Sequence, residues 1–142
     1  MKTKTKIKIT SPARLHLGFM DLNGSLGRKF GSVGLAINSI ETSITVSKNS
    51  LNQNKVLNEI NKRAYEYADL ILKAYEVDET VLIDVHKKIP EHAGLGSGTQ
   101  LALSVGVAVS KLFDLNLSLM DIGKVLDRGN RSGIGIGAFE SG

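Results

Sequence analysis

The 142-residue sequence contains no cysteine and no tryptophan, and aromatic residues make up only 5% of it. Without cysteine, the chain has neither a disulfide framework nor a metal site built on thiolates. Proteins that bind nucleic acids commonly stack bases on aromatic rings set among basic residues, and this sequence shows no such interleaving. We therefore expect no nucleic-acid partner, although the net charge is +4.

Long apolar runs are also missing. The uncharged stretch 93–110 is rich in glycine, serine and threonine, which makes it too polar for a convincing membrane span. The N-terminal segment MKTKTKIKIT lacks the apolar core of a secretory signal. With 42% hydrophobic residues, the chain is long enough to bury one core. We expect a cytoplasmic protein with no membrane partner.

Hydrophobic periodicity predicts a mixed α+β domain. Strands are expected where lysines alternate with Ile7 and Ile9, at 30–38 and 42–49 with a turn at 38–41, and at 80–90, where Pro90 ends the ladder. Helices are expected at 56–75 and 100–112, and a further helix is capped by Ser118 and Asp121 and closed by Gly129. The final segment, GIGIGAFESG, is expected to be a strand.

The most informative stretch is IPEHAGLGSGTQ at 89–100, which places three glycines between a strand and a helix. Glycines there let backbone amides wrap an anion at the positive end of the helix dipole. Ser97 and Thr99 add hydroxyls that can bind phosphate or Mg²⁺, and Ser97 can cap the helix. The alternative is a turn that only packs a helix tightly against a sheet.

The stretch KKIPEHAGLGSGTQ resembles the P-x-x-x-G-L-G-S-S/G phosphate loop of the GHMP kinase superfamily. The resemblance implies an N-terminal domain of the ribosomal-protein-S5-domain-2-like type over residues 1–142. It also implies a C-terminal domain that lies outside this chain. The residues expected around the phosphates of the bound ligand are Gly94, Leu95, Gly96, Ser97, Gly98 and Thr99.

Two departures from the superfamily pattern argue against a kinase. In SPARLHLGFMDLNG the usual lysine is replaced by Arg14, and the acidic residue is displaced to Asp21. Farther along, Ser132 and Gly133 align with the motif S-G-x-D, whose aspartate is the catalytic base, and Gly135 occupies the aspartate position. A glycine cannot take a proton from a hydroxyl group, so phosphoryl transfer loses its base unless Glu140 replaces it.

Four segments resemble one branch of the superfamily, the β-ribofuranosylaminobenzene 5′-phosphate synthases. They are SPARLHLGFMDLNG, GRKFGSVGLAI, IPEHAGLGSGTQLAL and RGNRSGIGIGAFESG. The resemblance implies phosphoribosyl pyrophosphate as donor and 4-hydroxybenzoate or 4-aminobenzoate as acceptor, with loss of CO₂ and pyrophosphate. It places the reaction early in the biosynthesis of tetrahydromethanopterin-type cofactors. Mg²⁺ is the expected metal, ATP is expected only for a kinase, and we expect a homodimer.

The catalytic candidates are Arg14, His16, Asp21 and Arg131. Arg14 can clamp a phosphate or the benzoate carboxylate, or lie on the surface. His16 is either an acid/base group or a packed strand histidine. Asp21 can hold Mg²⁺ together with Ser97, or stabilise the cationic sugar, although DLNG is also an ordinary turn.

The remaining candidates bind the donor. Arg28 follows a glycine and either binds an anion or is an exposed loop charge. Arg131 lies beside Ser132 and Gly133, which are expected to contact the donor, whereas Arg128 can simply complement a helix dipole. A phosphate-binding fragment without catalysis and an ATP-dependent small-molecule kinase remain the alternative functions. No metal-histidine site is expected, because the three histidines lack ligand spacing.

Overall fold

The computed structural model describes residues 4–19, 25, 32–49, 59–128 and 134–141. The elements along the chain are β1 (Lys6–Phe19), β2 (Ser32–Lys48), α1 (Glu59–Ala74), β3 (Val81–Lys87), α2 (Ser97–Leu112), α3 (Leu119–Val125) and α4 (Ile134–Ser141). This mixture confirms the expected α+β class. No helix in the described part of the chain combines the length and apolar character needed to cross a bilayer.

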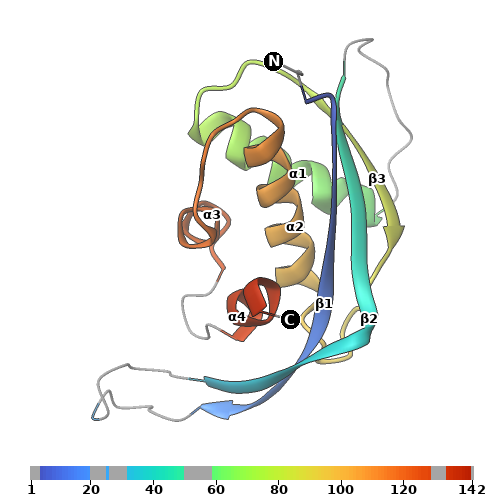
Figure 1. The fold of residues 1–142 in the computed structure, drawn as a ribbon, viewed down its shortest axis with the longest axis vertical. Helices are drawn as coiled ribbons and strands as arrows, with labels where there is room; N and C mark the ends of the chain where they lie inside the picture. Colours follow the sequence, from blue (N-terminus) through green and yellow to red (C-terminus); the bar gives the residue numbers. More distant parts are fainter. Residues whose placement is uncertain (1–3, 20–24, 26–31, 50–58, 129–133, 142) are drawn as a thin grey trace.

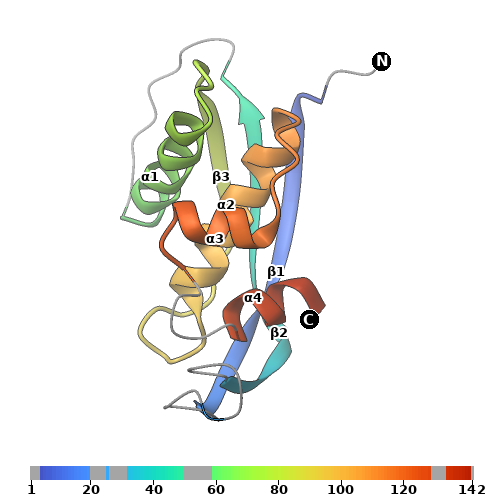
Figure 2. The same cartoon turned by 90° about the vertical axis from the view of Figure 1, so that its left-hand side faces the viewer.

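The three strands form one antiparallel sheet in the order β1-β2-β3. Helices α1 and α2 cover one face of the sheet, and α3 lies on the far side of α2 (Figures 1 and 2). β1 is an edge strand, and Lys4, Lys6 and Lys8 are exposed as the alternating pattern predicts. Charged side chains on such an edge discourage pairing with another chain.

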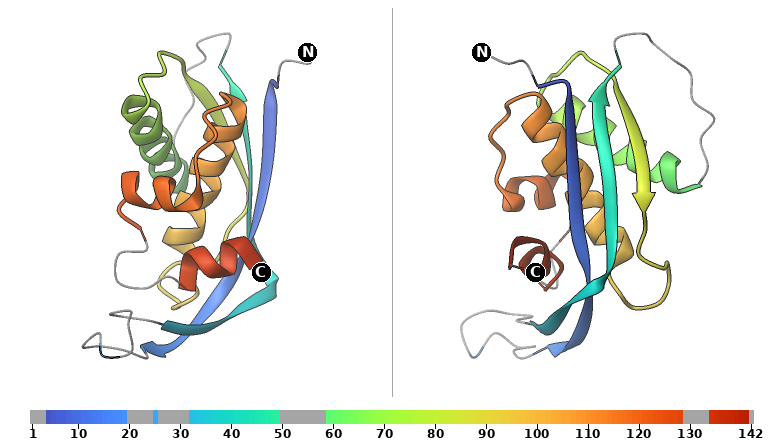
Figure 3. Two further views of the ribbon diagram at one scale, coloured as in Figure 1. Left: turned by 60° about the vertical axis from the view of Figure 1, so that its left-hand side comes forward. Right: turned by 45° about the vertical axis from the view of Figure 1, so that its right-hand side comes forward.

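β1 and β2 form a long ribbon whose distal part bends away from the sheet (Figure 3). The turn predicted at 38–41 is wrong, because β2 continues through it from Ser32 to Lys48. The register shifts at this point: Pro12 pairs with Glu41, whereas Ala13 pairs with Ile37. Proline cannot donate to the ladder, and the three intervening residues of β2 are accommodated as an irregularity rather than as a hairpin.

The core lies between the sheet and the two long helices. Ile44 and Ile83 from the sheet pack against Ile71 of α1 and Leu103 of α2, and all four are fully buried. Each such side chain contributes about 1.5–3 kcal/mol by leaving water. The interior face predicted for 56–75 is confirmed at Ala64, Ala68 and Ile71, whereas Tyr75, assigned to the same face, is exposed and lies past the end of α1. The buried helix predicted at 100–112 is confirmed and starts earlier, at Ser97.

The predicted capping box of α3 is confirmed. Ser118 Oγ accepts a hydrogen bond from the Asp121 backbone N–H at 3.1 Å, and the Asp121 carboxylate accepts from the Ser118 N–H. The helix ends at Val125, and Gly129, the expected closing residue, lies outside the described residues. α3 approaches α2 closely because Gly106 has no side chain: a Cβ there would collide with Ile122.

The strand predicted for GIGIGAFESG is wrong, since residues 134–141 form the helix α4. The glycine–isoleucine alternation imitates the period of a strand, and glycine disfavours helices. Tertiary packing overrides both signals. Ile136 and Phe139, three residues apart, lie on one helical face and pack against the core, and α4 contacts β1 and α2.

Candidate functional site

The glycine turn joins β3 to α2, as the sequence predicts. Gly94 and Gly96 have φ angles of 71° and 79°. Residues other than glycine adopt this left-handed conformation only at an energetic cost. Gly96 is the N-cap of α2 and Ser97 is its first residue. The expectation that Ser97 caps the helix is therefore wrong, because the turn places it one position too far along.

Arg14 of β1 holds this turn. Its backbone N–H donates to the Leu95 carbonyl at 2.9 Å, and its Nη1 donates to the Gly94 carbonyl at 3.1 Å. A Cβ on Gly96 would lie 2.9 Å from Arg14 Nε. Burial lowers the pKa of Arg14, although a guanidinium keeps its charge in proteins. The bare backbone at Gly96 therefore lets a permanent cation pack directly against the turn.

Two further guanidinium groups lie at the first turn of α2. A Cβ on Gly98 would be 3.0 Å from Arg63 Nη2 and 3.7 Å from Arg128 Nη2. Both arginines converge on Tyr67 Oη, to which Arg128 donates at 2.6 Å and Arg63 at 3.5 Å. The Arg128 guanidinium also lies 5.6 Å from the centre of the Tyr67 ring, a cation–π contact.

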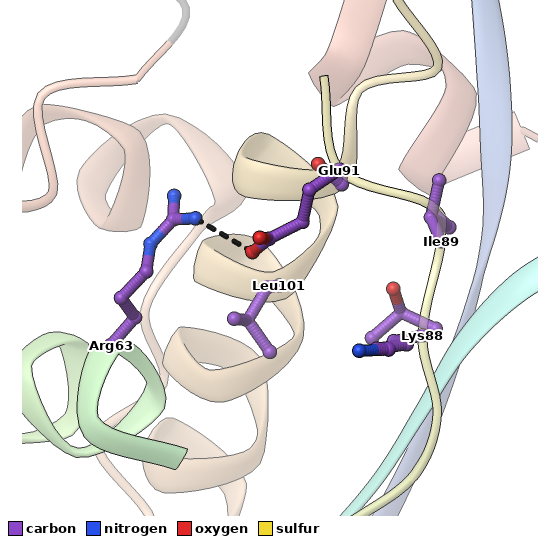
Figure 4. Close-up of a pocket in the computed structure, with 7 residues that line it drawn as sticks. Arg63, Lys88, Ile89, Glu91 and Leu101 are labelled. Carbon is purple, nitrogen blue, oxygen red and sulfur yellow. Dashed lines mark hydrogen bonds and ion pairs between the residues drawn. The ribbon is translucent and has the colours of Figure 1, made fainter. Parts of the chain in front are cut away.

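Arg63 pairs with the carboxylate of Glu91, whose Oε1 lies 3.0 Å from Arg63 Nη1. The hydrogen bond with Tyr67, followed by the proximity of Tyr67 and Glu91, raises the pKa of Arg63. Figure 4 shows this pair, with Arg63 projecting from α1 toward Glu91 in the segment before α2. The Glu91 side chain is 37% exposed, so solvent screens the pair.

The pair borders a pocket of about 280 Å³, counting its open side. The pocket draws residues from α1, β2, the segment after β3 and the start of α2, so four separate parts of the chain meet there (Figure 4). Its lining residues are Thr42, Arg63, Lys88, Ile89, Glu91, Ser97 and Leu101. Cations and hydroxyls at the positive end of a helix suit an anionic ligand.

The structure brings Arg14 together with three of the predicted turn residues, Gly94, Leu95 and Gly96. The other three, Ser97, Gly98 and Thr99, form the start of α2. His16 lies two residues beyond Arg14 on β1, paired in register with Gly34, so the two side chains project to the same side of the strand. Five predicted site residues lie outside the described residues: Asp21, Arg28, Arg131, Ser132 and Gly133.

Sequence interpretation missed Arg63, Tyr67 and Glu91. Arg63 and Tyr67 are four residues apart on a helix, so they share one face, but the pattern gives no sign of what that face meets. Arg128 was expected to serve a helix dipole and instead lies at Gly98. Chain folding brings residues from positions 63 to 128 together, which no local motif reveals.

Comparisons with known proteins identify the family of this chain. Residues 58–141 match the model for the GHMP kinases N-terminal domain. Over 94% of the chain, the sequence is 38% identical to the β-ribofuranosylphenol 5′-phosphate synthase of Methanocaldococcus jannaschii. It is 37% identical over 96% of the chain to the protein of the same name from Archaeoglobus fulgidus. The chain spans only 44% and 43% of the lengths of these two relatives.

A solved structure of 4-(cytidine 5′-diphospho)-2C-methyl-D-erythritol kinase has the same fold. It superposes with a TM-score of 0.64 at 24% identity, covering 88% of this chain and 47% of the kinase. Together with the family match, this likeness confirms the ribosomal-protein-S5-domain-2-like fold that the sequence resemblance implied.

Proposed function

Because this chain belongs to the GHMP kinase family, we propose that its glycine turn holds phosphates and that the complete protein is a ribosylphenol phosphate synthase. In this reaction phosphoribosyl pyrophosphate donates its phosphoribosyl group to a para-substituted benzoate. The products are a β-ribofuranosyl arene 5′-phosphate, CO₂ and pyrophosphate.

The observation that carries the proposal is the contact between Arg14 and the turn. Arg14 binds the carbonyls of Gly94 and Leu95 and so presents a cation beside the N-terminus of α2. When the anomeric C–O bond breaks, negative charge grows on the departing pyrophosphate. A preorganised cation and a helix dipole stabilise such charge without reorganising during the reaction.

The acceptor's chemistry explains why a kinase-like domain without a base suits this reaction. A ring carbon of the benzoate attacks the anomeric carbon, and the carboxylate on that carbon then leaves as CO₂. No hydroxyl group has to be deprotonated for the attack, so glycine at position 135 is no handicap. In a kinase, the same glycine would remove the group that activates the hydroxyl acceptor.

The name shared by the two archaeal relatives favours 4-hydroxybenzoate as the acceptor. Both are named for a ribofuranosylphenol product, and a phenol results when 4-hydroxybenzoate loses its carboxylate. An aminobenzene would result from 4-aminobenzoate. We therefore propose the hydroxy acid, and with it the early step of tetrahydromethanopterin-type cofactor synthesis that the sequence resemblance implies.

The described residues are compatible with a Mg²⁺ ion that is bound mainly by the phosphates of the substrate. Among the described residues, no group of three or more histidine and acidic side chains is arranged to hold a metal ion. Mg²⁺ typically needs only one or two protein ligands beside phosphates and water. The Ser97 hydroxyl, which lines the pocket, is the candidate ligand, and the ion would neutralise charge on the pyrophosphate.

The test incubates the complete protein with phosphoribosyl pyrophosphate, Mg²⁺ and carboxyl-labelled 4-hydroxybenzoate. We expect labelled CO₂ to be released in step with pyrophosphate, and an aromatic ribosyl phosphate to accumulate. Parallel reactions with labelled 4-aminobenzoate identify the acceptor. Absence of labelled CO₂ with both acids, in a protein that binds the donor, would contradict the proposal.

An ATP-dependent small-molecule kinase is the second candidate, because the turn resembles the kinase phosphate loop. The same preparation should be assayed for ATP hydrolysis in the presence of small alcohols. ATP turnover that depends on an alcohol would favour the kinase over the synthase.

A further inference from the structure

We propose that Arg63 and Arg128, braced by Tyr67, form a second anion subsite beside the glycine turn, and that Glu91 occupies it in the absence of ligand. The subsite is separate from Arg14, which contacts Gly94 and Gly96 rather than Gly98. Its ligand is a phosphate monoester.

Tyr67 fixes the two cations. Tyr67 as a whole residue is 9% exposed, and its hydroxyl accepts from both guanidinium groups. Two like charges repel, so holding them on one neutral hydroxyl is unfavourable unless an anion lies between or beside them. Arg128 Nε is also buried without a hydrogen-bond partner among the described residues.

Several cations gather beside the first turn of α2. Arg14, Arg63 and Arg128 all lie against the stretch from Gly96 to Gly98, and Lys88 lines the adjoining pocket. Glu91 is the carboxylate paired with this cluster in the described part of the chain. It bonds only one of the two arginines that Tyr67 holds. An oxyanion with three or more acceptor oxygens would satisfy both guanidinium groups.

The identity of the ligand rests on the proposed function. The donor carries a pyrophosphate on one end of the ribose and a phosphate monoester on the other. If the turn and Arg14 hold the departing pyrophosphate, the monoester requires a second cationic site. Arg63 and Arg128 supply one at the first turn of α2. Glu91 then acts as an internal substitute for the phosphate and moves aside when the donor binds.

The test measures binding of two simple probes, ribose 5-phosphate and inorganic pyrophosphate, to the complete protein by calorimetry. Arg63→Gln and Arg128→Gln should each weaken ribose 5-phosphate about tenfold, the effect of losing one charged hydrogen bond. Both should change pyrophosphate affinity less than threefold. Arg14→Gln should show the reverse preference. Equal weakening of both probes by all three variants, or no weakening, would overturn the proposal.

Glu91→Gln supplies a test that gains affinity. Removing the competing carboxylate should strengthen ribose 5-phosphate binding about twofold to fivefold, in line with an exposed ion pair. The matched control is Glu41→Gln. Glu41 pairs with Lys87 at 2.9 Å, and it projects to the opposite side of β2 from its neighbour Thr42, which lines the pocket. Unchanged affinity in Glu91→Gln would show that Glu91 does not occupy the subsite.

Two controls distinguish loss of ligand binding from loss of folding. Thermal melting of each variant identifies loss of structure, and Arg63→Lys keeps the charge while losing the planar fork. If Arg128→Gln does not fold, the partly exposed Arg63 and Glu91 still decide the matter. Binding of simple phosphates does not require turnover. These affinities therefore test the subsite, whereas the release of labelled CO₂ tests the proposed reaction.

Discussion

Replacing Gly96 with alanine tests whether the turn is built around Arg14. Gly96 has a φ of 79°, and a Cβ there would lie 2.9 Å from Arg14 Nε and 3.0 Å from Arg14 Cγ. These atoms lie in the middle of the side chain, whose end is tied to the Gly94 carbonyl at 3.1 Å. The arginine therefore cannot move away from the new methyl group without breaking that bond.

The expected loss has two parts. Left-handed backbone costs alanine about 1–2 kcal/mol. Losing the bond from Arg14 to the turn adds about 0.5–1.5 kcal/mol. We expect Gly96→Ala to lower the free energy of unfolding by about 1.5–3.5 kcal/mol, the sum of these two terms. The same displacement of Arg14 should weaken pyrophosphate binding in the folded fraction.

Two glycines of the same chain serve as controls. Gly94 also has a positive φ, of 71°, but a Cβ there meets nothing within 4 Å, so Gly94→Ala should show only the backbone term of about 1–2 kcal/mol. Gly137 lies in α4 with open space around it. Gly137→Ala should stabilise the protein by about 0.5–1 kcal/mol, the gain in helix propensity.

The assay is urea denaturation of the four proteins, followed by circular dichroism, and a repeat in an Arg14→Ala background. Without the arginine side chain, the loss from Gly96→Ala should shrink to the value measured for Gly94→Ala. If the loss is unchanged in that background, Arg14 does not constrain Gly96 and the account of the turn fails.

Three further predictions follow from other parts of the structure. Ser104→Ala should lower the free energy of unfolding by about 1–3 kcal/mol, because it leaves the buried hydroxyl of Ser11, 2.9 Å away, without its partner. Adding Ser11→Ala to the same protein should recover part of this loss, as measured by urea denaturation. Ser118→Ala should cost about 1 kcal/mol at neutral pH through the lost cap. Hydrogen bonds from the Ser118 side chain and backbone lower the pKa of Asp121. The stability that these bonds give is present above the ordinary aspartate pKa and is lost as the pH falls through the lowered pKa. The difference in melting temperature between Ser118→Ala and wild type should therefore become smaller in acid. Gly135→Asp should weaken phosphoribosyl pyrophosphate binding without creating kinase activity, and intact donor affinity beside a lowered melting temperature would mean that the residue only packs in α4.

The sequence by itself determined the features that depend on short-range chemistry. The glycine turn, the capping box at Ser118 and the interior faces of α1 and α2 follow from residue type and spacing within a few positions. The family also follows from local motifs, because the glycine turn between β3 and α2 carries the residue types of the superfamily motif in the same order.

The tertiary structure decided everything that depends on what a segment meets. The alternating segment at 134–141 is a helix because Ile136 and Phe139 pack against the core. The stretch 38–41 stays within one strand because β1 pairs with β2 on both sides of the irregularity, at Glu41 and at Ile37. The convergence of Arg63, Tyr67 and Arg128 has the same origin. Their meeting at Gly98 depends on how α1 packs beside α2 and on how the chain leaves α3. Such contacts join residues far apart in sequence, and their energies exist only once the intervening chain has folded.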